Sequence, residues 1–500
     1  MTNLPAEVAV MAEQVTGRGL RGVVCAAAPI AAQTAAQAMR DGGNAFDAAV
    51  TAALAETVLL PPKCGLGGDL VAIVLHAGAS EPEALIAVGG APAGLADVAA
   101  SGNWRKVGPN SVGPPGAAAG YSALADHGRF DRSRLARPAI ELAVGGFAWA
   151  TVCTRLSEQA VALVAEMHPE GCTYYPGGLP IVAGSAVRLP RLADALAEWA
   201  ERGSQFLDGP VGEAILRAVC ARGGVLSRDD LGSARAEWMP SARSVVGGRS
   251  IWVTPAPTHG PSLLDALAGV PAEAMRSAGG AAAAALHSSV MRAIAGRRDM
   301  LADPGGTSMV SAADSDGNVV VIIHSNSFPR FGSGIVVPEY DLPLANRAGR
   351  GFSPEPGHPN FPVAGRRPAT TLHAWVVSDL EGHPSLFGGT PGGANQMPWN
   401  AQTVARIVGG EERPGVLVAA PVWEWLPDDD GLRLEVGFDV ETEAALVAAP
   451  AVTGARIVHA PRWGCKSAQQ VVRVPPADGP RKGVWEGAAD PRTVGMALGL

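Results

Sequence analysis

Charge is scarce in this 500-residue chain, and its absence narrows the range of functions. Charged residues make up 17% of the sequence, below the roughly 25% usual for soluble proteins. The formal net charge is −8, and no run of Lys and Arg is long enough to follow a phosphate backbone, which argues against a nucleic-acid partner. No span of about 20 apolar residues is present, and the first residues lack a basic start followed by an apolar core. We therefore expect a cytoplasmic protein with no membrane partner and no signal peptide.

Clusters of metal-binding or redox residues are absent too. The ten histidines are dispersed, with no H-E-x-x-H or His-x-His pair, and no two cysteines form a C-x-x-C pair. A Walker A loop is missing, and the glycine turn Cys64-Gly-Leu-Gly-Gly-Asp69 precedes a predicted strand, whereas a dinucleotide fingerprint follows one. We expect no metal, no cofactor, and reduced thiols at the six cysteines, which are Cys25, Cys64, Cys153, Cys172, Cys220 and Cys465.

Glycine and proline are plentiful, with 63 and 41 residues, and they help to delimit the elements. The length allows about three domains or one large unit. Residues 29–58 are Ala-rich and predict two helices, because Gly42 and Gly43 would end the first and Asn44 would cap the second. An apolar run at 70–77 predicts a buried strand. Between about 115 and 300, apolar residues spaced three and four apart predict a mostly helical scaffold.

The pattern changes from helical to β-rich at Asp303. Asp303-Pro-Gly-Gly306 predicts a tight turn, and residues 307–314 have strand composition. Asp316-Gly-Asn318 predicts a hairpin turn, after which 319–326 predicts the returning strand. Short β-rich segments separated by Gly- and Pro-rich loops follow, at 373–379, 384–389 and 432–438.

Thr307 stands directly after the Gly-Gly turn. A threonine hydroxyl is a weak nucleophile unless a base lies beside it, and an amino-terminal threonine supplies that base from its own α-amine. Attack on the preceding carbonyl would cut the chain between Gly306 and Thr307 and expose this amine. Taken without further context, an ordinary hairpin start is the more common explanation, and no G-x-S-x-G elbow offers a serine nucleophile instead.

Seven ordered motifs supply that context. They are 35–68 with its Gly-Gly-Asn-Ala-x-Asp-Ala-Ala core, Gly113-Pro-Pro-Gly-Ala-Ala-Ala-Gly-Tyr121, 307–318, Phe331-Gly-Ser-Gly334, Gly365-Arg-Arg-Pro368, Thr390-Pro-Gly-Gly393 and Ala489-Asp-Pro-Arg492. On these motifs the chain resembles the gamma-glutamyltranspeptidase family of N-terminal nucleophile hydrolases over nearly all its length. The variants at Asn346-Arg347, Gly357-His-Pro-Asn360 and 392–396 look more like the family's cytoplasmic bacterial branch than its secreted, glutathione-degrading branch.

The resemblance implies an α+β fold, a four-layer αββα sandwich made as one precursor. Self-cleavage would separate a large part, residues 1–306, from a small part, residues 307–500, and the two parts would form a heterodimer. Whether two heterodimers pair further is left open. The resemblance also implies catalysis without a cofactor.

Catalytic roles carry over residue by residue. Thr307 would be the nucleophile of both self-cleavage and catalysis, and Ser325 falls where the family has a threonine that orients the nucleophile. Gly392 and Gly393 would donate backbone N–H groups to the oxyanion, since glycine lets the backbone approach the reacting carbonyl closely.

Substrate-binding roles carry over to three further positions. Thr370 and Thr371 fall where the family has a Ser-Ser pair that binds the donor's carboxylate, and Ser327 falls where an asparagine contacts the donor. The plainer alternative for these three positions and for Ser325 is that they are strand residues whose hydroxyls are already hydrogen-bonded.

Two charged anchors of a γ-glutamyl donor are missing. The segment Ala91-Pro-Ala-Gly-Leu-Ala-Asp97 lacks the arginine that would clamp the donor's carboxylate, and Gly351 replaces the acidic residue that would receive its ammonium. Arg347 and Arg350 lie in the same loop as Gly351 and are candidate substitutes for the arginine. Arg105 and Lys106 form a second candidate pair, although charged loop residues are usually only solvated.

The sequence therefore predicts a self-processing hydrolase or acyltransferase that acts on a small acyl donor other than glutathione. One alternative is a C–C bond hydrolase that removes an oxalyl-type group, because this chemistry is attributed to family members in the alkylproline pathways of lincosamide, hormaomycin and pyrrolobenzodiazepine antibiotics. An alternative of another class is an unprocessed, inactive binding or scaffold homologue.

Overall fold

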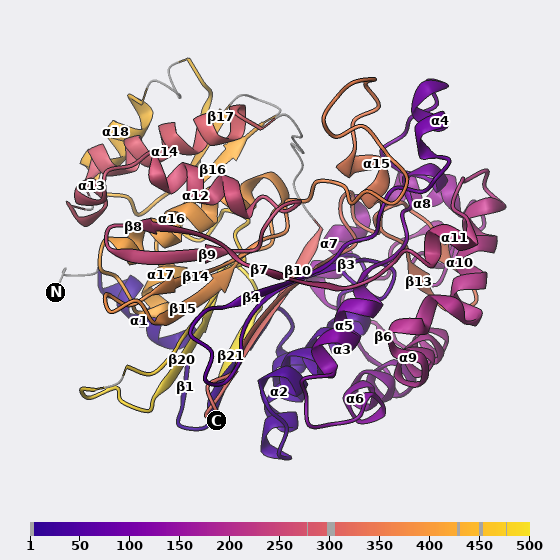
Figure 1. Cartoon of the computed structure of the whole chain (residues 1–500), viewed down its shortest axis with the longest axis horizontal. Coiled ribbons are helices and arrows are strands. Elements are labelled where there is room, and N and C mark those ends of the chain that lie inside the picture. Colours follow the sequence, from indigo (N-terminus) through magenta and orange to yellow (C-terminus); the bar gives the residue numbers. More distant parts are fainter. Residues whose placement is uncertain (1–4, 278, 298–305, 428–430, 450–453, 477) are drawn as a thin grey trace.

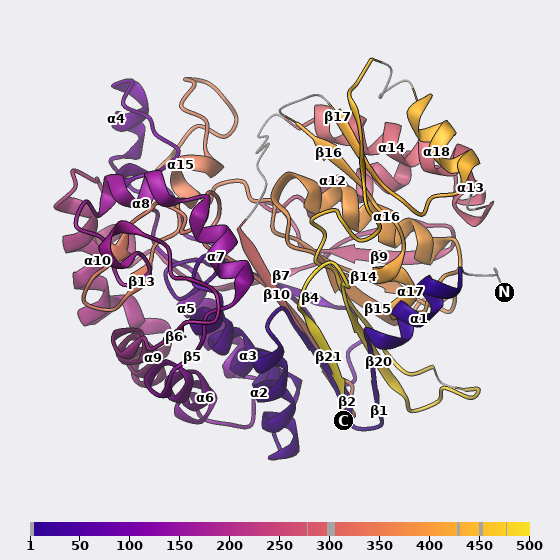
Figure 2. The same cartoon turned by 180° about the vertical axis from the view of Figure 1, so that it is seen from behind.

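The structure is a computed structural model that describes residues 5–277, 279–297, 306–427, 431–449, 454–476 and 478–500. Within these residues, two seven-stranded antiparallel sheets pack face to face, and helices cover both outer faces (Figures 1 and 2). The chain thus has the α+β fold with two large antiparallel sheets that the resemblance implies, and its layers run helix, sheet, sheet, helix.

The first sheet carries Thr307 at the start of one of its central strands. Its order is β21 (Met496–Gly499), β2 (Gly22–Ala26), β10 (Thr307–Asp314), β11 (Val319–Ser325), β3 (Asp69–Leu75), β4 (Glu83–Ala87) and β7 (Glu237–Pro240). The second sheet has the order β1 (Thr16–Gly19), β20 (Trp485–Ala489), β19 (Gln470–Arg473), β15 (Pro384–Gly389), β14 (Ala374–Ser378), β9 (Arg249–Val253) and β8 (Ala242–Val246). Both sheets take strands from before and after Thr307, so a cut there would leave two interleaved parts.

The helices divide between the two outer faces. Helices α2 (Pro29–Arg40), α3 (Ala45–Leu59), α5 (Ala117–Ala125), α6 (Arg132–Gly145) and α9 (Pro190–Arg202) lie on the side of the first sheet, and α12 (Gly260–Ala268), α14 (Gly280–Ala295) and α16 (Gln396–Val408) lie on the side of the second (Figure 2). The remaining helices are α1 (Ala6–Gln14), α4 (Leu95–Ala100), α7 (Thr151–Glu158), α8 (Val161–Met167), α10 (Pro210–Cys220), α11 (Arg228–Leu231), α13 (Ala272–Ser277), α15 (Arg347–Gly351), α17 (Pro414–Ala419) and α18 (Val440–Val447). Small sheets are formed by β5 (Phe147–Ala148) with β6 (Ala186–Val187), by β12 (Val336–Val337) with β13 (Leu342–Pro343), and by β16 (Trp423–Leu426), β17 (Gly431–Glu435) and β18 (Ile457–Ala460).

Alternation along the strands separates the core into layers. On β10 and β11, Met309 and Ile323 pack in the cluster between the two sheets, whereas Val310 and Ile322 pack against the helices of the first sheet. Because side chains alternate across a strand, Thr307 and Ser325 belong to the face that looks toward the second sheet.

The local signals at the first two helices are confirmed. Helix α2 ends at Arg40 before Gly42 and Gly43, and α3 begins directly after Asn44. The Asn44 side chain accepts hydrogen bonds from the N–H groups of Phe46 and Asp47, and the Asp47 carboxylate accepts one from the Asn44 N–H, which completes a capping box. The predicted strand at 70–77 is β3.

The predicted hairpin after Thr307 is confirmed as well. Strand β10 spans 307–314 as predicted, and β11 returns beside it. The Asp314 carboxylate holds the turn by accepting from the N–H groups of Asp316 and Asn318, and Gly317 adopts a φ of 101°. Of the tight turn predicted before Thr307, residues 303–305 lie outside the described residues.

The prediction of a mostly helical scaffold at 115–300 is wrong for residues 237–253. Helices fill much of this stretch, but β7 joins the edge of the first sheet, and β8 and β9 form the edge of the second. Gly247 and Gly248 turn β8 into β9 with φ values of 62° and 85°, a two-residue turn that favours a hairpin.

The alternative of three separate domains is wrong, because strands from both ends of the chain share each sheet.

Candidate active site

Thr307 lies in a row of polar side chains across three strands of the first sheet. The register pairs Thr307 with Ser325 on β11, and Ser325 in turn with Asp69 on β3. Residues paired across antiparallel strands point to the same face, so all three side chains look toward the second sheet. Thr307 and Ser325 are 2% and 1% exposed. The row therefore forms a buried polar strip at one end of the layer between the sheets.

The Ser325 hydroxyl connects the nucleophile to the peptide bond before it. Ser325 Oγ lies 2.5 Å from the Gly306 carbonyl oxygen, 3.0 Å from Thr307 Oγ1 and 2.9 Å from the Ser327 nitrogen. Its single proton goes to the carbonyl, since a carbonyl only accepts, so the Thr307 hydroxyl and the Ser327 N–H both donate to Ser325. One hydroxyl thus orients Thr307 and polarises the carbonyl that Thr307 would attack.

Glycine is required at position 306 for a steric reason. A Cβ there would overlap the carbonyl oxygen of Ser327, which comes close because Ser327 has a φ of 67°. Ser327 itself is buried, and its N–H donates to Ser325 Oγ. Its predicted contact with the donor stays a prediction.

The Gly392–Gly393 loop follows β15 of the second sheet. Gly389 at the end of β15 would place a Cβ 3.0 Å from Ile323 Cδ1, so the ends of β15 and β11 approach closely. Gly392 and Gly393 have φ values of 145° and 60°, and a Cβ on Gly392 would overlap the ring of Trp399. Only glycine fits this loop, and the loop lies at the same end of the intersheet layer as Thr307.

Gln396 links this loop to the Thr370–Thr371 segment, a connection that the sequence analysis missed. With its amide turned so that both ends are paired, Gln396 accepts from the Gly393 N–H at 3.2 Å and donates to the Thr371 carbonyl at 2.9 Å. The Gly393 N–H is thus hydrogen-bonded to a side-chain amide oxygen. A glutamine three residues after a Gly-Gly pair carries no pattern by which the sequence could have revealed the contact.

Thr370 and Thr371 precede β14, beside the Gly392–Gly393 loop. Thr370 Oγ1 accepts from the Leu372 N–H at 3.2 Å, so this hydroxyl is partly occupied within its own segment. His373 donates from Nδ1 to the Thr371 carbonyl and accepts at Nε2 from Asn400 Nδ2. Burial lowers the pKa of His373 to about 4, which keeps the ring neutral and this arrangement intact.

The two arginines of α15 are placed differently. Arg347 is buried, and its Nε donates to Asp69 Oδ2 at 2.8 Å, so its guanidinium joins the end of the row that begins with Thr307. Arg350 stacks 5.3 Å from the ring centre of Phe328, and burial lowers its pKa to about 10. The structure thus brings Arg347 to the polar row, whereas Arg350 lies against the Phe328 ring.

The second predicted pair of anchors does not join the site. Arg105 forms a two-pronged ion pair with Glu166 at 2.7 and 3.0 Å, and both side chains are about half exposed. The Lys106 carbonyl accepts from Asn346. These contacts support the plainer interpretation of this loop as solvated surface.

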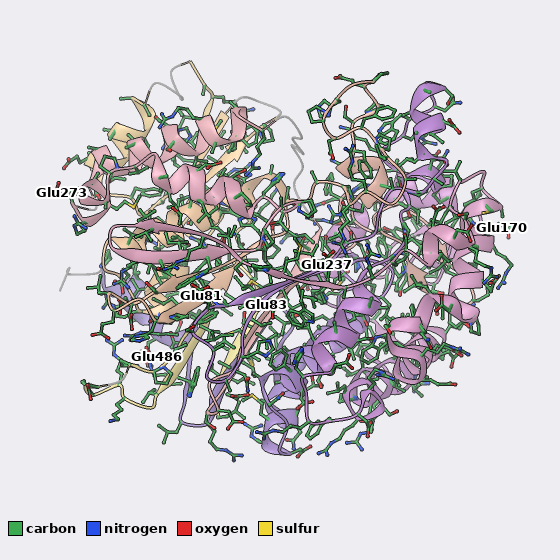
Figure 3. The ribbon with its side chains drawn as sticks, viewed as in Figure 1. Glu81, Glu83, Glu170, Glu237, Glu273 and Glu486 are labelled. Carbon is green, nitrogen blue, oxygen red and sulfur yellow. The ribbon has the colours of Figure 1, made fainter. Side chains whose placement is uncertain are left out.

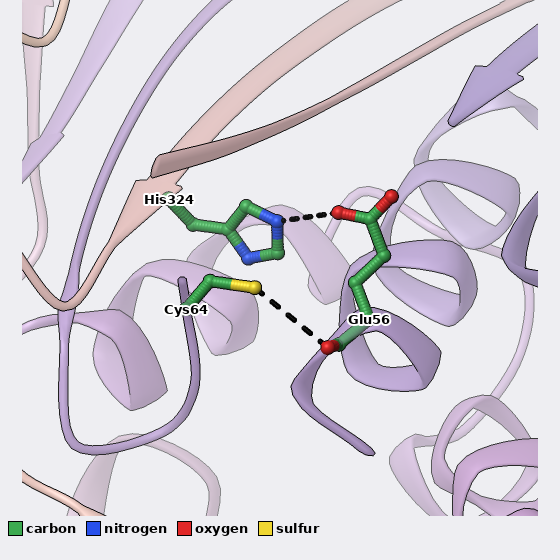
Figure 4. Close-up of side chains that lie close together, drawn as sticks. All are labelled: Glu56, Cys64 and His324. Carbon is green, nitrogen blue, oxygen red and sulfur yellow. Dashed lines mark hydrogen bonds and ion pairs between the residues drawn. The ribbon is translucent and has the colours of Figure 1, made fainter. Parts of the chain in front are cut away.

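A buried cluster around His324 lies on the face of β11 opposite to Ser325 (Figure 4). His324 Nε2 is 3.0 Å from Glu56 Oε2, and its Nδ1 is 2.7 Å from the Tyr121 hydroxyl. Cys64 contacts the Glu56 carbonyl through Sγ, and burial raises the pKa of its thiol well above the usual value. Both histidine nitrogens are engaged, so these side chains form a buried hydrogen-bond network.

Acidic side chains are spread over the molecule. Figure 3 places Glu170 and Glu273 at opposite sides and labels Glu81, Glu83, Glu237 and Glu486 between them. Ion pairs with arginine engage three of these: Glu81 with Arg243, Glu237 with Arg367, and Glu486 with Arg18. None of the three is thus a candidate general acid.

Among the described helices, none is both long and apolar enough to cross a bilayer.

Comparison with known proteins assigns this arrangement to a family. The gamma-glutamyltranspeptidase family model matches residues 31–305 and 294–500. The chain is 25% identical to the glutathione hydrolase-like YwrD proenzyme of Bacillus subtilis, over 96% of this chain and 99% of that one, and 26% identical to the oxamate amidohydrolase proenzyme of Klebsiella pneumoniae, over 96% and 98%. The crystal structure of cephalosporin acylase from Bacillus halodurans aligns with a TM-score of 0.82 at 26% identity, covering 97% of each chain. The chain therefore belongs to the gamma-glutamyltranspeptidase family and is an N-terminal nucleophile hydrolase of that family.

Proposed function

We propose that this chain is a self-processing hydrolase or acyltransferase that uses Thr307 on a small acyl donor other than glutathione. The observation that carries the proposal is the Ser325 hydroxyl, which contacts both the Thr307 hydroxyl and the Gly306 carbonyl. An ordinary hairpin start has no need for a buried hydroxyl between these two groups.

Self-cleavage would proceed by transfer of the Gly306 acyl group. Thr307 Oγ1 attacks the Gly306 carbonyl carbon, and the negative charge that develops on the carbonyl oxygen is stabilised by the Ser325 O–H. The C–N bond then breaks, its nitrogen takes the proton lost by the hydroxyl, and Gly306 is held as an ester on Oγ1. Water hydrolyses this ester, which leaves a carboxylate on Gly306 and a free α-amine on Thr307. Residues 1–306 and 307–500 stay together as a heterodimer because their strands interleave in both sheets.

Catalysis would then reuse the same hydroxyl. The free α-amine accepts its proton as Oγ1 attacks the donor's carbonyl, and the Gly392 and Gly393 N–H groups bind the oxyanion. Collapse of the intermediate releases the leaving group with that proton. Water or an amine next takes the acyl group from Oγ1 and restores the enzyme.

The missing glutamyl anchors support a donor other than glutathione. The segment 91–97 has no arginine, and Gly351 occupies the place of the acidic residue that would bind an ammonium. A Cβ at Gly351 would lie 2.5 Å from Pro368 Cβ and 2.8 Å from the Ala369 carbonyl oxygen, so the packing leaves no room for a carboxylate side chain there. The names of relatives such as the oxamate amidohydrolase and the cephalosporin acylase agree with amide donors other than glutathione.

Denaturing electrophoresis tests the self-processing step. The purified protein should run as two bands whose masses sum to 50.8 kDa, and sequencing of the smaller should begin at Thr307. Thr307→Ala should stay as one band without activity, while Thr307→Ser, which keeps a hydroxyl, should still split. A wild-type protein that stays whole would instead support the scaffold alternative, and cleavage of Thr307→Ala would refute the nucleophile.

Mass spectrometry of the products tests the donor. γ-Glutamyl-p-nitroanilide should be cleaved far more slowly than simple acyl p-nitroanilides, because Gly351 stands where the family has the acidic partner of its ammonium. Incubation with an oxalyl-substituted pyrroline separates the two chemistries, since release of oxalate by C–C cleavage would favour the alkylproline-pathway alternative over C–N acyl transfer. Rapid turnover of the γ-glutamyl compound would contradict the assignment to a donor other than glutathione.

A further inference from the structure

His259 lies in the loop before α12 and has an unusual hydrogen-bond arrangement. Its Nδ1 is 2.6 Å from Arg297 Nη1. A guanidinium only donates, so Nδ1 must accept and the proton of the neutral ring must sit on Nε2. Burial and the charge of Arg297 both hold the pKa of His259 well below its usual value, which agrees with a neutral ring. His259 is 3% exposed, and its Nε2–H meets no acceptor among the described residues.

Arg347 presents a second buried donor of this kind. Its Nε is committed to Asp69, but its Nη2 meets no acceptor in the described part of the chain, although the residue is only 5% exposed. A buried donor without an acceptor costs about 1–3 kcal/mol, and more when it is charged. The His259 Nε2–H and Arg347 Nη2–H groups are two buried donors of this kind. If they lie close together, a ligand group that accepts from both would satisfy them.

Backbone hydrogen bonds bring the two side chains to one place. The Thr370 N–H donates to the Pro257 carbonyl, and the His259 N–H donates to the Thr370 carbonyl, each at 3.0 Å. On the other side, the Ala369 N–H donates to the Gly351 carbonyl at the end of α15, the helix that begins with Arg347. The segment 369–370 therefore joins the two donors. In agreement, the charge of Arg347 is among those that lower the pKa of His259.

We infer that His259 Nε2 and Arg347 Nη2 bind a carboxylate of the acyl donor, one oxygen each. This inference rests on the proposed function and names the substrate class of the same site. The anchor differs from a single arginine clamp, because a neutral imidazole fixed by Arg297 supplies one donor and an arginine fixed by Asp69 supplies the other. Gly351, which ends the helix that begins with Arg347, has no side chain that could accept from an ammonium.

The row of strands sets the distance between this anchor and the nucleophile. Asp69, which holds Arg347, lies two strands from Thr307, a backbone separation of about 10 Å at the usual strand spacing. A carboxylate bound there is separated from the reacting carbonyl by a short chain. The donor class is therefore a monoamide of a dicarboxylic acid that lacks an α-amino group.

A series of chromogenic donors tests this class on the processed enzyme. The probes are succinyl-, glutaryl- and adipyl-p-nitroanilide, with pentanoyl-p-nitroanilide as the neutral counterpart of the glutaryl compound. We expect kcat/KM for the best acid probe to exceed that of the neutral probe at least tenfold. A ratio near one in an enzyme that has split into two chains and turns over the neutral probe would overturn the carboxylate site while leaving the proposed function intact.

Variants assign the effect to the two side chains. His259→Leu and Arg347→Lys should each reduce the acid-to-neutral ratio of kcat/KM at least tenfold. His287→Leu is the matched control, because His287 on α14 is also buried but packs against Trp423 of β16, and the variant should keep the wild-type ratio. Equal ratios in wild type and His259→Leu would overturn the assignment.

A binding measurement makes the test independent of turnover and of Arg347, whose replacement leaves Asp69 without its partner. Free glutarate should raise the melting temperature of the processed wild-type protein more than pentanoate does, and His259→Leu should remove this difference. Glutarate and pentanoate that act alike on the wild-type protein would contradict the site. A protein that never splits would refute the proposed function instead, and electrophoresis of the same sample reports this separately.

Discussion

Replacing Ser325 with alanine is the sharpest test of the self-cleavage geometry. The change removes the donor that lies 2.5 Å from the Gly306 carbonyl oxygen and the acceptor that orients the Thr307 hydroxyl at 3.0 Å. Loss of one preorganised oxyanion donor typically lowers a rate by about 10²–10³-fold, or about 2.7–4 kcal/mol in the barrier. We therefore expect Ser325→Ala to cleave at least about 100-fold more slowly than the wild-type chain.

The rate is measured by following the conversion of freshly synthesised precursor into two bands over time. Ser311→Ala is the matched control, because Ser311 is a buried serine on the neighbouring strand β10 that looks to the same face as Ser325 and bonds to Gln470, and the variant should cleave at the wild-type rate. Ser325→Thr keeps the hydroxyl and should retain most of the rate. Cleavage of a folded Ser325→Ala protein as fast as wild type would refute the role of this hydroxyl.

Three further predictions concern other parts of the molecule, with stability measured on the uncut Thr307→Ala chain so that one polypeptide unfolds. The pKa of His373 falls from 6.5 to about 4 on folding, so the folded state resists protonation. Up to about 3 kcal/mol of the free energy of unfolding, present above pH 6.5, should therefore be lost as the pH falls toward 4. Urea unfolding of His373→Asn should show a shallower pH dependence than that of the parent chain. Gly392→Ala should lower turnover of the acyl probes at least about 100-fold, because the added Cβ would overlap the Trp399 ring. Gly410→Ala is the control and should keep its activity, since Gly410 also has a positive φ but has open space around it. Equal activities of the two variants would argue against the proposed oxyanion loop. Asn44→Ala should destabilise the chain by about 1–2 kcal/mol through loss of the α3 cap without slowing self-cleavage, and calorimetry with electrophoresis checks both parts.

Much of the fold could be predicted because its signals are local. The stop at Gly42 and Gly43, the cap at Asn44 and the turn at Asp316–Asn318 each depend on residues a few positions apart, and each formed as predicted. The prediction failed at residues 237–253 because the local signal was weak there. Strands β7 and β8 lie at the edges of their sheets with mixed exposed and buried positions, so their apolar pattern was weak and the helical spacing of their surroundings prevailed.

The candidate site divides in a similar way. Thr307 and the Gly392–Gly393 loop were predicted from motifs to be the nucleophile and the oxyanion loop, and these roles stay predictions; the structure gives the contacts of Ser325 with Thr307 and of Gly392 with Trp399. Arg347 was one of several arginines that the sequence offered, and nothing in the sequence marked Asp69 as its partner. His259 and Gln396 were missed, because a single histidine or glutamine in a loop has no periodic or spacing signal.

By itself, the sequence determined where the locally capped helices and the hairpin after Thr307 begin and end, which residue stands after the Gly-Gly turn, and which glutamyl anchors are missing. Only the tertiary structure decided which side chains meet: Asp69 and Arg347 are 278 residues apart, and His259 and Arg297 are 38 apart. Helix caps and turns arise from hydrogen bonds between near neighbours in the chain. Contacts of the site arise instead from which strands lie side by side in two sheets, and that order is fixed by packing of the whole chain.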